Sequence, residues 1–188
     1  MRILITFAGD RGRLKFPRQY NQLVQGFIYR HLDAWLAKKV HDEGFADPHN
    51  LKRRLRLFTF SRLIPVREAG GRWHSEDDHI LFEGPVQLTI ASPVADFLSS
   101  LVEHLLKNPQ LDLGGREVSL IEARVEPAPE YRRPVLVRAL SPITVYSTLH
   151  APNGKKKTYY YSPIESEFSL LVVKNLARKV RAWSGEEA

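Results

Sequence analysis

The pattern of hydrophobic and polar residues in the first half of the chain changes from a strand period to a helix period. Arg2 to Phe7 alternates as a β-strand does, and a polar loop is expected over residues 8–19. Apolar residues then recur at the spacing of one helix face, at Leu23, Val24, Phe27, Ile28, Leu32, Trp35, Leu36 and Val40. Lys38 and Lys39 complement the dipole in the last turns of this helix, and Gly44 is expected to end it.

Three further strands are predicted between the first helix and residue 91. The segment Arg54 to Ser61 is aromatic and alternating, which favours a strand. A turn at residues 69–71 follows. The segments His79 to Glu83 and Val86 to Ala91 are then expected to form a hairpin joined through Gly84-Pro85.

A second helix and a last strand complete the first half. Ser92-Pro93 is typical of a helix start, and Asn108-Pro109 is expected to end the helix. Its predicted buried stripe is Val94, Phe97, Leu98, Leu101, Val102, Leu105 and Leu106. A strand from Val118 to Val125 follows, and its predicted inward residues are Ile121, Ala123 and Val125. This order of elements predicts an α+β, ferredoxin-like (split βαβ) domain over residues 1–127, with both helices on one face of an antiparallel sheet.

The second half begins with the same elements and then stops. After the linker 127–129, strand material is expected at Pro134 to Leu140, at Ile143 to Thr148 and at Thr158 to Tyr161, with a turn at residues 152–154. Ser162-Pro163 opens a helix. Its apolar residues are Phe168, Leu171, Val172, Leu176, Val180 and Trp183. Because so little sheet is available to cover that face, residues 134–188 are expected to be the start of a second ferredoxin-like (RRM-like) domain, whose missing C-terminal part was removed or is supplied by a partner.

Composition excludes several classes of protein. Hydrophobic residues make up 43%, as in globular proteins, and no apolar run approaches the ~20 residues that a membrane span needs. Since the N-terminus also lacks a secretory signal, a cytoplasmic protein without a membrane partner is expected. The absence of cysteine excludes disulfides, thiolate metal sites and a cysteine nucleophile. The remaining histidines besides His41 show no metal-binding spacing, so they are expected at the surface and no metal or other cofactor is expected.

The positive charge is clustered. Lys and Arg total 28 against 21 Asp and Glu, a net charge of +7. The clusters are Arg11, Arg13, Lys15 and Arg18; Lys52, Arg53, Arg54 and Arg56; Arg132 and Arg133; and Lys155, Lys156 and Lys157. A polyanion is the natural partner of such a surface, although one basic run alone is more often a solvated face. The lysines at 155–157 precede Tyr159, Tyr160 and Tyr161, which fits either a nucleic-acid contact or a solvated hairpin tip with core tyrosines.

Five features follow one another in a characteristic order. They are Gln25-Gly26-Phe27-Ile28-Tyr29, then His41, then Leu57-Phe58-Thr59-Phe60-Ser61, then Ser141-Pro142-Ile143-Thr144-Val145, and finally Ser162-Pro163 with Glu167-Phe168. In this order they resemble the Cas6 family, the endoribonucleases that process CRISPR RNA. The resemblance implies tandem ferredoxin-like domains and metal-independent cutting of precursor RNA once per repeat. The glycine-rich loop near the C-terminus of that family, part of its RNA-binding surface, is absent from this chain.

The resemblance places the family's catalytic tyrosine on Tyr29, its histidine on His41 and its basic residue on Arg56. In metal-free cleavage the 2′-hydroxyl attacks the adjacent phosphorus and leaves 5′-hydroxyl and 2′,3′-cyclic phosphate ends. An imidazole suits the proton transfer, a phenol can orient the nucleophile, and a guanidinium offers a fork of donors to phosphate oxygens. Each residue also has a structural interpretation: a helix C-terminal contact for His41, a core-rim position for Tyr29 and a phosphate-positioning role for Arg56.

Binding residues and partners complete the hypothesis. The candidate RNA-binding residues are Arg18, Lys52, Arg53, Arg54, Lys155, Lys156, Lys157 and Tyr159. The expected partner is CRISPR repeat RNA, while subunits of a CRISPR effector complex and a second copy of the chain stay open. Two alternatives are kept: a non-catalytic module that holds repeat RNA within an effector complex, and a structural protein whose open second half is completed by another chain.

Overall fold

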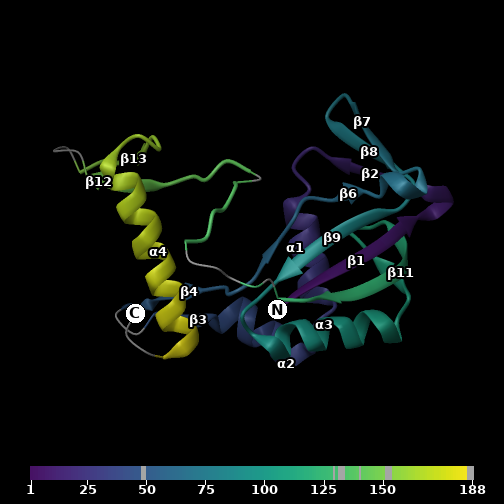
Figure 1. Ribbon diagram of the computed structural model, residues 1–188, viewed down its shortest axis with the longest axis horizontal. Coiled ribbons are helices and arrows are strands. Elements are labelled where there is room, and N and C mark those ends of the chain that lie inside the picture. Colours follow the sequence, from purple (N-terminus) through teal and green to yellow (C-terminus); the bar gives the residue numbers. More distant parts are fainter. Residues whose placement is uncertain (48–49, 129, 131–133, 140, 151–153, 186–188) are drawn as a thin grey trace. The chain divides into compact units, whose positions relative to one another are not determined.

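The computed structural model describes residues 1–47, 50–128, 130, 134–139, 141–150 and 154–185 (Figure 1). The chain forms two compact units. The first contains residues 1–45 and 54–128, and the second contains residues 46–53 and 129–188. The short internal segment 46–53 therefore belongs with the C-terminal part of the chain, a grouping that the hydrophobic pattern does not predict. The domain boundaries 1–127 and 134–188 stay a prediction.

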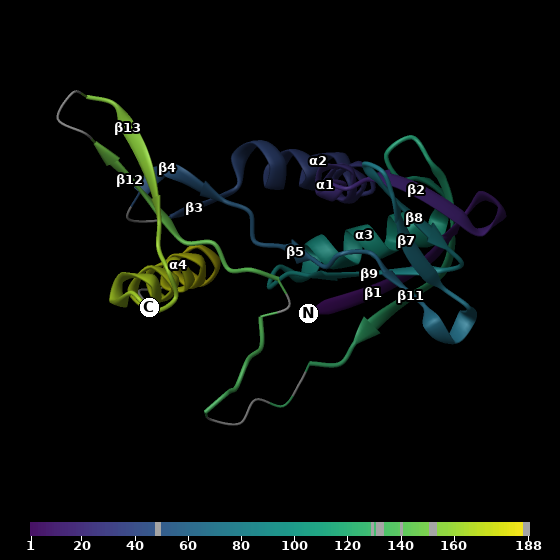
Figure 2. The same cartoon turned by 90° about the horizontal axis from the view of Figure 1, so that it is seen from above.

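The first unit is built on one antiparallel sheet. The order of its strands is β10-β11-β1-β9-β5, and β6 also pairs with β9. These strands are β1 (Arg2–Gly9), β5 (Thr59–Phe60), β6 (Ile64–Pro65), β9 (Val86–Ala91), β10 (Gln110–Asp112) and β11 (Glu117–Glu126). Helices α1 (Asn21–Arg30) and α3 (Ala95–Lys107) lie on the same side of this sheet (Figure 2). Strand β1 lies between β9 and β11, and β5 lies on the far side of β9. This is the strand order of a ferredoxin-like sheet and confirms the α+β fold.

The core of the first unit lies between that sheet and the two helices. Ile3, Ile5 and Phe7 are fully buried, as the two-residue period of β1 requires. Four residues of the predicted α3 stripe are buried as well: Phe97, Leu98, Leu101 and Leu105. Leu106 is 60% exposed, so its placement in the stripe is wrong. It lies beside Leu105 on the helix, about 100° away from that stripe.

A β-bulge overturns the predicted inward position of Ile121 in the last strand. Glu122 pairs with Thr6 and Leu120 pairs with Phe7, which leaves Ile121 between them without a partner. Ile121 is consequently 56% exposed instead of inward. Val125 is 54% exposed although it pairs with buried Ile3, because β10 pairs only with the start of β11 and leaves this end of the strand at the sheet edge. Ala123 is half-buried.

The predicted long first helix is broken in two. After α1, a short helix α2 (Ala34–Lys38) is followed by a π-helical turn, η2 (Lys39–Glu43). The carboxylate of Asp33 accepts a hydrogen bond from the backbone N–H of Trp35 at 2.9 Å and so caps α2. Because the chain changes direction there, the face defined by the earlier residues does not continue. Trp35, which the pattern placed on it, is 66% exposed.

A second, three-stranded sheet contains β2 (Arg13–Pro17), β7 (Arg72–Glu76) and β8 (His79–Glu83), in the order β2-β8-β7. The predicted polar loop over 8–19 therefore contains a strand, as well as the 3-10 turn η1 (Asp10–Gly12). The predicted hairpin of β8 with β9 is also wrong, since β8 pairs with β2 and β7 while β9 pairs with β1. Gly84, at a φ of 78°, turns the chain from one sheet into the other.

The predicted strand from Arg54 to Ser61 is interrupted. Its first residues end β4 (Asn50–Leu55), which pairs with β3 (Phe45–Asp47), and its last residues include β5. Residues 56–58 belong to no strand. This interruption allows the chain to leave one sheet and enter another within a few residues. The predicted turn at 69–71 follows the 3-10 turn η3 (Arg67–Ala69).

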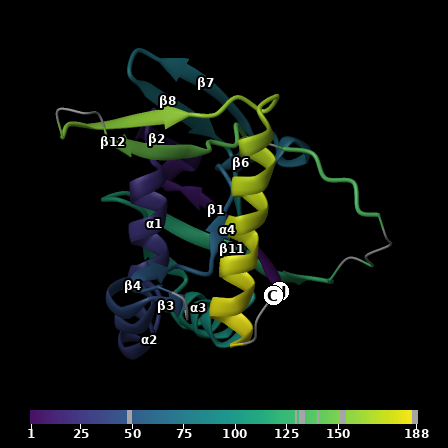
Figure 3. The ribbon, with the colours of Figure 1, turned by 90° about the vertical axis from the view of Figure 1, so that its left-hand side faces the viewer.

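The second unit contains the hairpin of β12 (Tyr146–His150) and β13 (Lys156–Tyr160), and helix α4 (Ser166–Ser184), which runs without a break (Figure 3). Residues 134–139 form no strand, contrary to the prediction, and most of the predicted 152–154 turn lies outside the described residues. The backbone N–H of Ser162 donates to the carboxylate of Glu165, so this serine does mark the approach to the helix.

Helix α4 is only partly covered: Phe168, Leu171 and Val172 are half-buried. None of its residues is buried. Its most exposed apolar residues are Leu170, Val173, Leu176, Val180 and Trp183, at 46–61% exposure. The prediction that a C-terminal part of this second domain is missing stays a prediction. Within the described residues, no helix has both the length and the hydrophobicity to cross a membrane.

Candidate active site

Tyr29, His41 and Arg56 come together in the first unit. Tyr29 lies in the last turn of α1, His41 in the π-turn η2, and Arg56 directly after β4. The rings of Tyr29 and His41 are 4.9 Å apart and nearly perpendicular, at 88°. The guanidinium of Arg56 donates from Nη2 to the backbone carbonyl of His41 at 2.8 Å. Three residues distant in the sequence are thus neighbours in the fold.

The π-turn and the glycine that ends it determine where His41 lies. The N–H of Gly44 donates to the carbonyl of Lys39 at 2.7 Å, a wider loop than an α-turn closes. Gly44 has a φ of 60°, and a Cβ at this position would lie 3.0 Å from the Cβ of Arg54. A side chain is therefore strained at residue 44, and glycine lets the chain turn back so that Arg56 reaches His41.

The hydroxyl of Tyr29 is buried and has no hydrogen-bond partner among the described residues. Its ring packs edge-on against Phe58, with ring centres 5.6 Å apart, as well as against His41. A buried hydroxyl without a partner costs about 1–3 kcal/mol, so most such groups in proteins are paired. A ligand can supply a partner to this oxygen only after the side chains that cover it move aside, and it would then recover that free energy.

Asp42 orients the ring of His41. Its Oδ1 lies 2.6 Å from Nδ1 of His41. An ionised carboxylate only accepts hydrogen bonds, so Nδ1 carries the hydrogen and Nε2 is left for a substrate. The His41 side chain is 59% exposed, which gives a large ligand access to Nε2. The sequence analysis did not single out Asp42, although the adjacent pair His41-Asp42 was a visible signal.

Ser92 anchors the backbone that follows Arg56. Its hydroxyl donates to the carbonyl of Leu57 at 2.7 Å and accepts from the N–H of Val94 at 3.0 Å. Ser92 was predicted to cap the second helix directly, but the residue before α3 is Val94. The buried serine instead ties the segment after Arg56 to the start of α3. Phe58 adds to this attachment by stacking on Phe97, with ring centres 4.9 Å apart.

The candidate RNA-binding residues fall into separate places. Arg18 donates to the carbonyl of Asp77 at 3.0 Å and to the hydroxyl of Ser75 at 2.8 Å, so part of its guanidinium holds the β7–β8 turn. Arg54 is exposed in the first unit. The side chains of Lys52 and Arg53, and all of Arg132 and Arg133, lie outside the described residues.

The lysines and tyrosines of the second unit lie on the β12–β13 hairpin. Lys155, Lys156 and Lys157 are exposed. The hydroxyl of Tyr159 donates to Glu165 at 2.8 Å, which raises the pKa of Tyr159, while the N–H of Ser162 together with this bond lowers the pKa of Glu165.

Neighbouring tyrosines of β13 point to opposite faces of the hairpin. Tyr160 packs on Tyr146 across the strand pair, with ring centres 5.7 Å apart, whereas Tyr159 contacts Tyr161. Tyr146 and Tyr160 are 59% and 63% exposed, so they are not core residues.

One histidine contradicts the expectation that the others lie at the surface. His31 is only 6% exposed, and its Nδ1 lies 2.7 Å from the carbonyl of Phe27. Burial disfavours the charged imidazole and lowers the pKa of His31, although the Phe27 carbonyl acts in the opposite direction. The described parts of His74, His79, His104 and His150 are not buried, and His49 lies outside the described residues. In the part of the chain that the structure describes, no group of three or more histidine, aspartate or glutamate side chains could hold a metal ion.

Comparison with protein families assigns both parts of the chain. Residues 15–124 match the family described as CRISPR-associated protein Cas6, N-terminal, and residues 126–188 match CRISPR associated protein Cas6, C-terminal. The chain belongs to the Cas6 family. A comparison with curated proteins found no match.

Solved structures support the same assignment. A structure described as CRISPR associated protein Cas6 is 25% identical, with a TM-score of 0.68, and the match covers 100% of this chain and 73% of that one. A Cas6-related protein from Pyrococcus furiosus is 18% identical, with a TM-score of 0.74 and coverage of 100% and 72%. A RAMP protein described as binding different RNA substrates is 22% identical, with a TM-score of 0.72 and coverage of 100% and 73%. The last two show the shared fold.

Proposed function

We propose that this Cas6 family member is a metal-independent endoribonuclease that cuts CRISPR repeat RNA. The observation that carries the proposal is the convergence of Tyr29, His41 and Arg56, with the Tyr29 hydroxyl buried and unpaired beside the exposed imidazole. A scissile phosphodiester placed there would meet a proton-transfer group, a hydroxyl donor and a cation.

The proposed reaction forms a bond from the 2′-oxygen to phosphorus and breaks the bond from phosphorus to the 5′-oxygen. A proton must leave the 2′-hydroxyl, and a proton must reach the departing 5′-oxygen. Nε2 of His41 moves the proton at one of these oxygens, and Asp42 stabilises the protonated ring. The Tyr29 hydroxyl orients the 2′-oxygen or shares the proton relay. The N–H groups of Arg56 that do not hold the His41 carbonyl donate to the non-bridging oxygens, where negative charge builds up.

We propose that the basic residues named from the sequence contact the RNA away from the scissile bond. They are Arg18, Lys52, Arg53, Arg54, Lys155, Lys156 and Lys157, together with Tyr159. Each lysine or arginine that neutralises a phosphate makes the affinity depend more steeply on salt. Subunits of a CRISPR effector complex and a second copy of the chain are further proposed partners, since α4 leaves apolar residues exposed.

A second candidate is a non-catalytic module that holds repeat RNA. One observation favours it: Nη2 of Arg56 donates a hydrogen bond to the His41 carbonyl. This arginine therefore has a structural role that does not require a catalytic one. In that case the chain would bind the repeat and leave it intact.

The test is to incubate the full chain with repeat RNA in EDTA. We expect cutting, with 5′-hydroxyl and 2′,3′-cyclic phosphate ends, and no cutting of a repeat with a 2′-deoxy sugar at the cleavage position. His41→Ala should lower the single-turnover rate by ~10²- to 10⁴-fold, the usual value of general acid–base catalysis, and leave RNA affinity within a few-fold. Arg56→Ala should lower both.

His79→Ala is the matched control, because it removes an imidazole from β8 and should cut at the parental rate. Binding without cutting by the unmodified chain would select the second candidate. A requirement for Mg²⁺, or parental cutting by His41→Ala, would remove the assignment of proton transfer to His41.

A further inference from the structure

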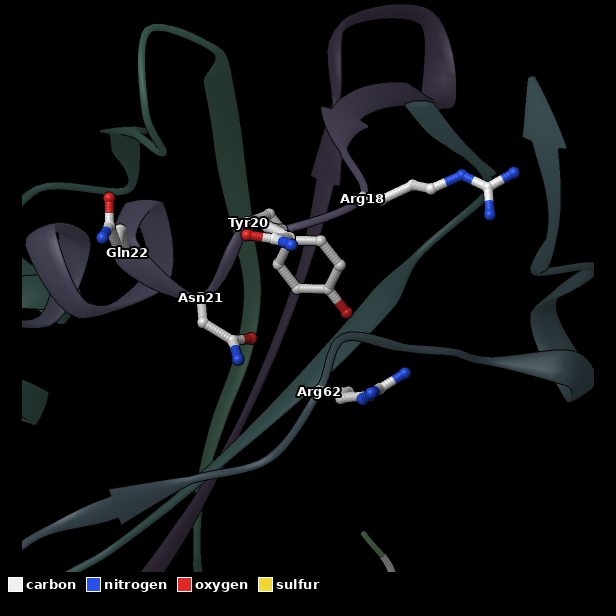
Figure 4. Close-up of a pocket in the computed structure, with 6 residues that line it drawn as sticks. Arg18, Tyr20, Asn21, Gln22 and Arg62 are labelled. Atoms are coloured by element: carbon white, nitrogen blue, oxygen red, sulfur yellow. The ribbon is translucent and has the colours of Figure 1, made fainter. Parts of the chain in front are cut away.

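A cavity of about 390 Å³ opens at the start of α1 (Figure 4). It is lined by Arg18, Gln19, Tyr20, Asn21, Gln22 and Arg62. Two of these six residues are arginines and none is acidic, so the lining carries positive charge and many hydrogen-bond donors. Such a lining suits an anion and disfavours an apolar ligand.

The two arginines are differently engaged. Arg18 uses Nε and one terminal nitrogen on the β7–β8 turn, which fixes its guanidinium and leaves its other terminal nitrogen available. The guanidinium of Arg62 has no hydrogen bond or ion pair with any described residue. In Figure 4 the two side chains lie on either side of the Tyr20 hydroxyl. Two guanidiniums beside one cavity make its electrostatic potential positive, which favours an anion there.

Tyr20 supplies a second, independent observation. Its side chain is only 5% exposed, and its hydroxyl accepts the N–H of Leu63 at 3.2 Å. The proton of that hydroxyl has no acceptor among the described residues. Burial raises the pKa of Tyr20 above its ordinary value, despite the lowering effect of the Leu63 N–H and of Arg62, so the phenol keeps its proton. A buried donor therefore points to the cavity without a partner.

The backbone at the start of α1 adds to the positive potential. Tyr20 occupies the N-cap position, and no side chain caps this ten-residue helix. The N–H groups of Asn21 and Gln22 are among those that a helix leaves unpaired at its N-terminus, where the dipole favours negative charge. Asn21 and Gln22 line the same cavity as Tyr20 and Arg62.

We propose that this cavity binds a phosphate group, and specifically a backbone phosphate of the repeat RNA other than the scissile one. The proposal rests on the proposed function, because it assumes that RNA is the ligand of the chain. Tyr20 and Tyr29 lie at opposite ends of α1, about 13 Å apart at 1.5 Å of rise per residue. One phosphate cannot reach both positions, so a strand that enters the candidate active site can place a different phosphate in the cavity. A volume of about 390 Å³ accommodates a phosphate together with part of its ribose.

The experiment measures repeat-RNA affinity at several salt concentrations in the His41→Ala background, so that cleavage does not interfere. Arg62→Ala should weaken binding about tenfold at low salt and reduce the slope of log affinity against log salt by about 0.7, the value for one single-strand phosphate contact. Arg62→Lys should recover most of the affinity. Arg67→Ala removes the same charge from an exposed position outside the cavity and should change the affinity less than twofold.

A second arm omits RNA and titrates inorganic phosphate into the full chain by NMR, with chemical shifts of the Asn21 and Gln22 amides as the readout. Saturable shifts that Arg62→Ala abolishes, together with the RNA result above, support the proposal. Shifts without any effect of Arg62→Ala on RNA affinity would overturn the RNA assignment in favour of a free phosphate ligand. Equal RNA affinities for Arg62→Ala and Arg67→Ala, without phosphate-induced shifts, would overturn the site itself.

The two proposals fail separately. If His41→Ala binds repeat RNA and the unmodified chain does not cut it, the catalytic assignment is wrong while the cavity is still tested by both arms. If the chain binds no repeat RNA at all, the RNA part of both proposals is overturned, and the phosphate titration alone decides whether the cavity binds an anion.

Discussion

The two units differ sharply in how much apolar surface they bury. Every buried hydrophobic residue in the described part of the chain lies in the first unit, between Ile3 and Val118. The second unit contributes none, and its long helix α4 has no buried residue. The reason is architectural: in the described residues, the first unit packs α1 and α3 on a sheet, while the second unit has α4 and the β12–β13 hairpin. Burial at roughly 25 cal/mol per Å² therefore stabilises the first unit far more than the second.

The difference matters for function because precise geometry needs a rigid support. Tyr29, His41 and Arg56 lie in the unit with the packed core, and Phe58 and Ser92 tie their surroundings to α3 and the residue before it. The lysines and tyrosines of β12–β13 lie in the unit without one. Proton transfer requires positions fixed within tenths of an ångström, whereas phosphate contact and base stacking tolerate movement.

The largest expected effect tests the contrast in burial directly. Phe97→Ala removes a fully buried ring from the first unit and should lower the free energy of unfolding by about 3–5 kcal/mol. Leu176→Ala, at a 56% exposed position of α4, should lower it by no more than about 0.5 kcal/mol. Denaturant unfolding monitored by circular dichroism measures both. Similar losses for the two variants would mean that α4 is buried against something in solution.

A smaller effect is expected where the packed unit supports the site. Ser92→Ala removes the hydrogen bonds to Leu57 and Val94 and leaves buried backbone groups without partners, so it should cost about 1–3 kcal/mol. It should also slow cleavage, since the segment after Arg56 loses its attachment. Ser119→Ala, on the exposed face of β11, is the control for a lost hydroxyl. Slow cleavage at unchanged stability would place Ser92 in the chemistry itself.

The next prediction concerns binding by the unit without a core. Tyr160→Ala should weaken repeat-RNA binding about tenfold, in line with the 1–3 kcal/mol that one stacked base contributes, and should leave the melting temperature of the first unit unchanged. Tyr160→Phe keeps the ring and should retain the affinity. Tyr159→Phe compares the opposite face, where the hydroxyl is tied to Glu165. If only Tyr159 variants lose affinity, RNA lies on that other face of the hairpin.

The smallest effect is a pH dependence that belongs to the first unit alone. Burial lowers the pKa of His31 from its ordinary value of 6.5, so below about pH 6.5 the unfolded chain binds a proton that the folded chain does not. The free energy of unfolding should therefore be flat above that pH and fall as the pH decreases below it. His31→Gln should remove this part of the dependence, and His79→Gln should keep it. Identical pH profiles for the two variants would show that His31 is accessible to protons in the folded state.

Local pattern was sufficient for much of the fold, while the candidate site was only partly predicted, since Asp42 was missed. The period of α3 placed Phe97, Leu98 and Leu101 in the core, since one amphipathic face buries the same residues whatever it packs against. The order of strands and helices gave the ferredoxin-like sheet. Tyr29, His41 and Arg56 could be named from the sequence because they lie in or next to short motifs that resemble one family.

Tertiary structure decided what depends on partners far along the chain. The alternating pattern predicts that Ile121 points inward, but the pairing of β11 with β1 leaves it in a bulge. The pattern predicts that segments 79–83 and 86–91 form a hairpin, but in the structure they belong to different sheets. Arg62 and Tyr20 share a cavity although forty-odd residues separate them, and no spacing rule connects them. A local sequence specifies which face of an element is apolar, but strand register, helix breaks and cavities follow from the long-range hydrogen bonds and packing that only the folded chain makes.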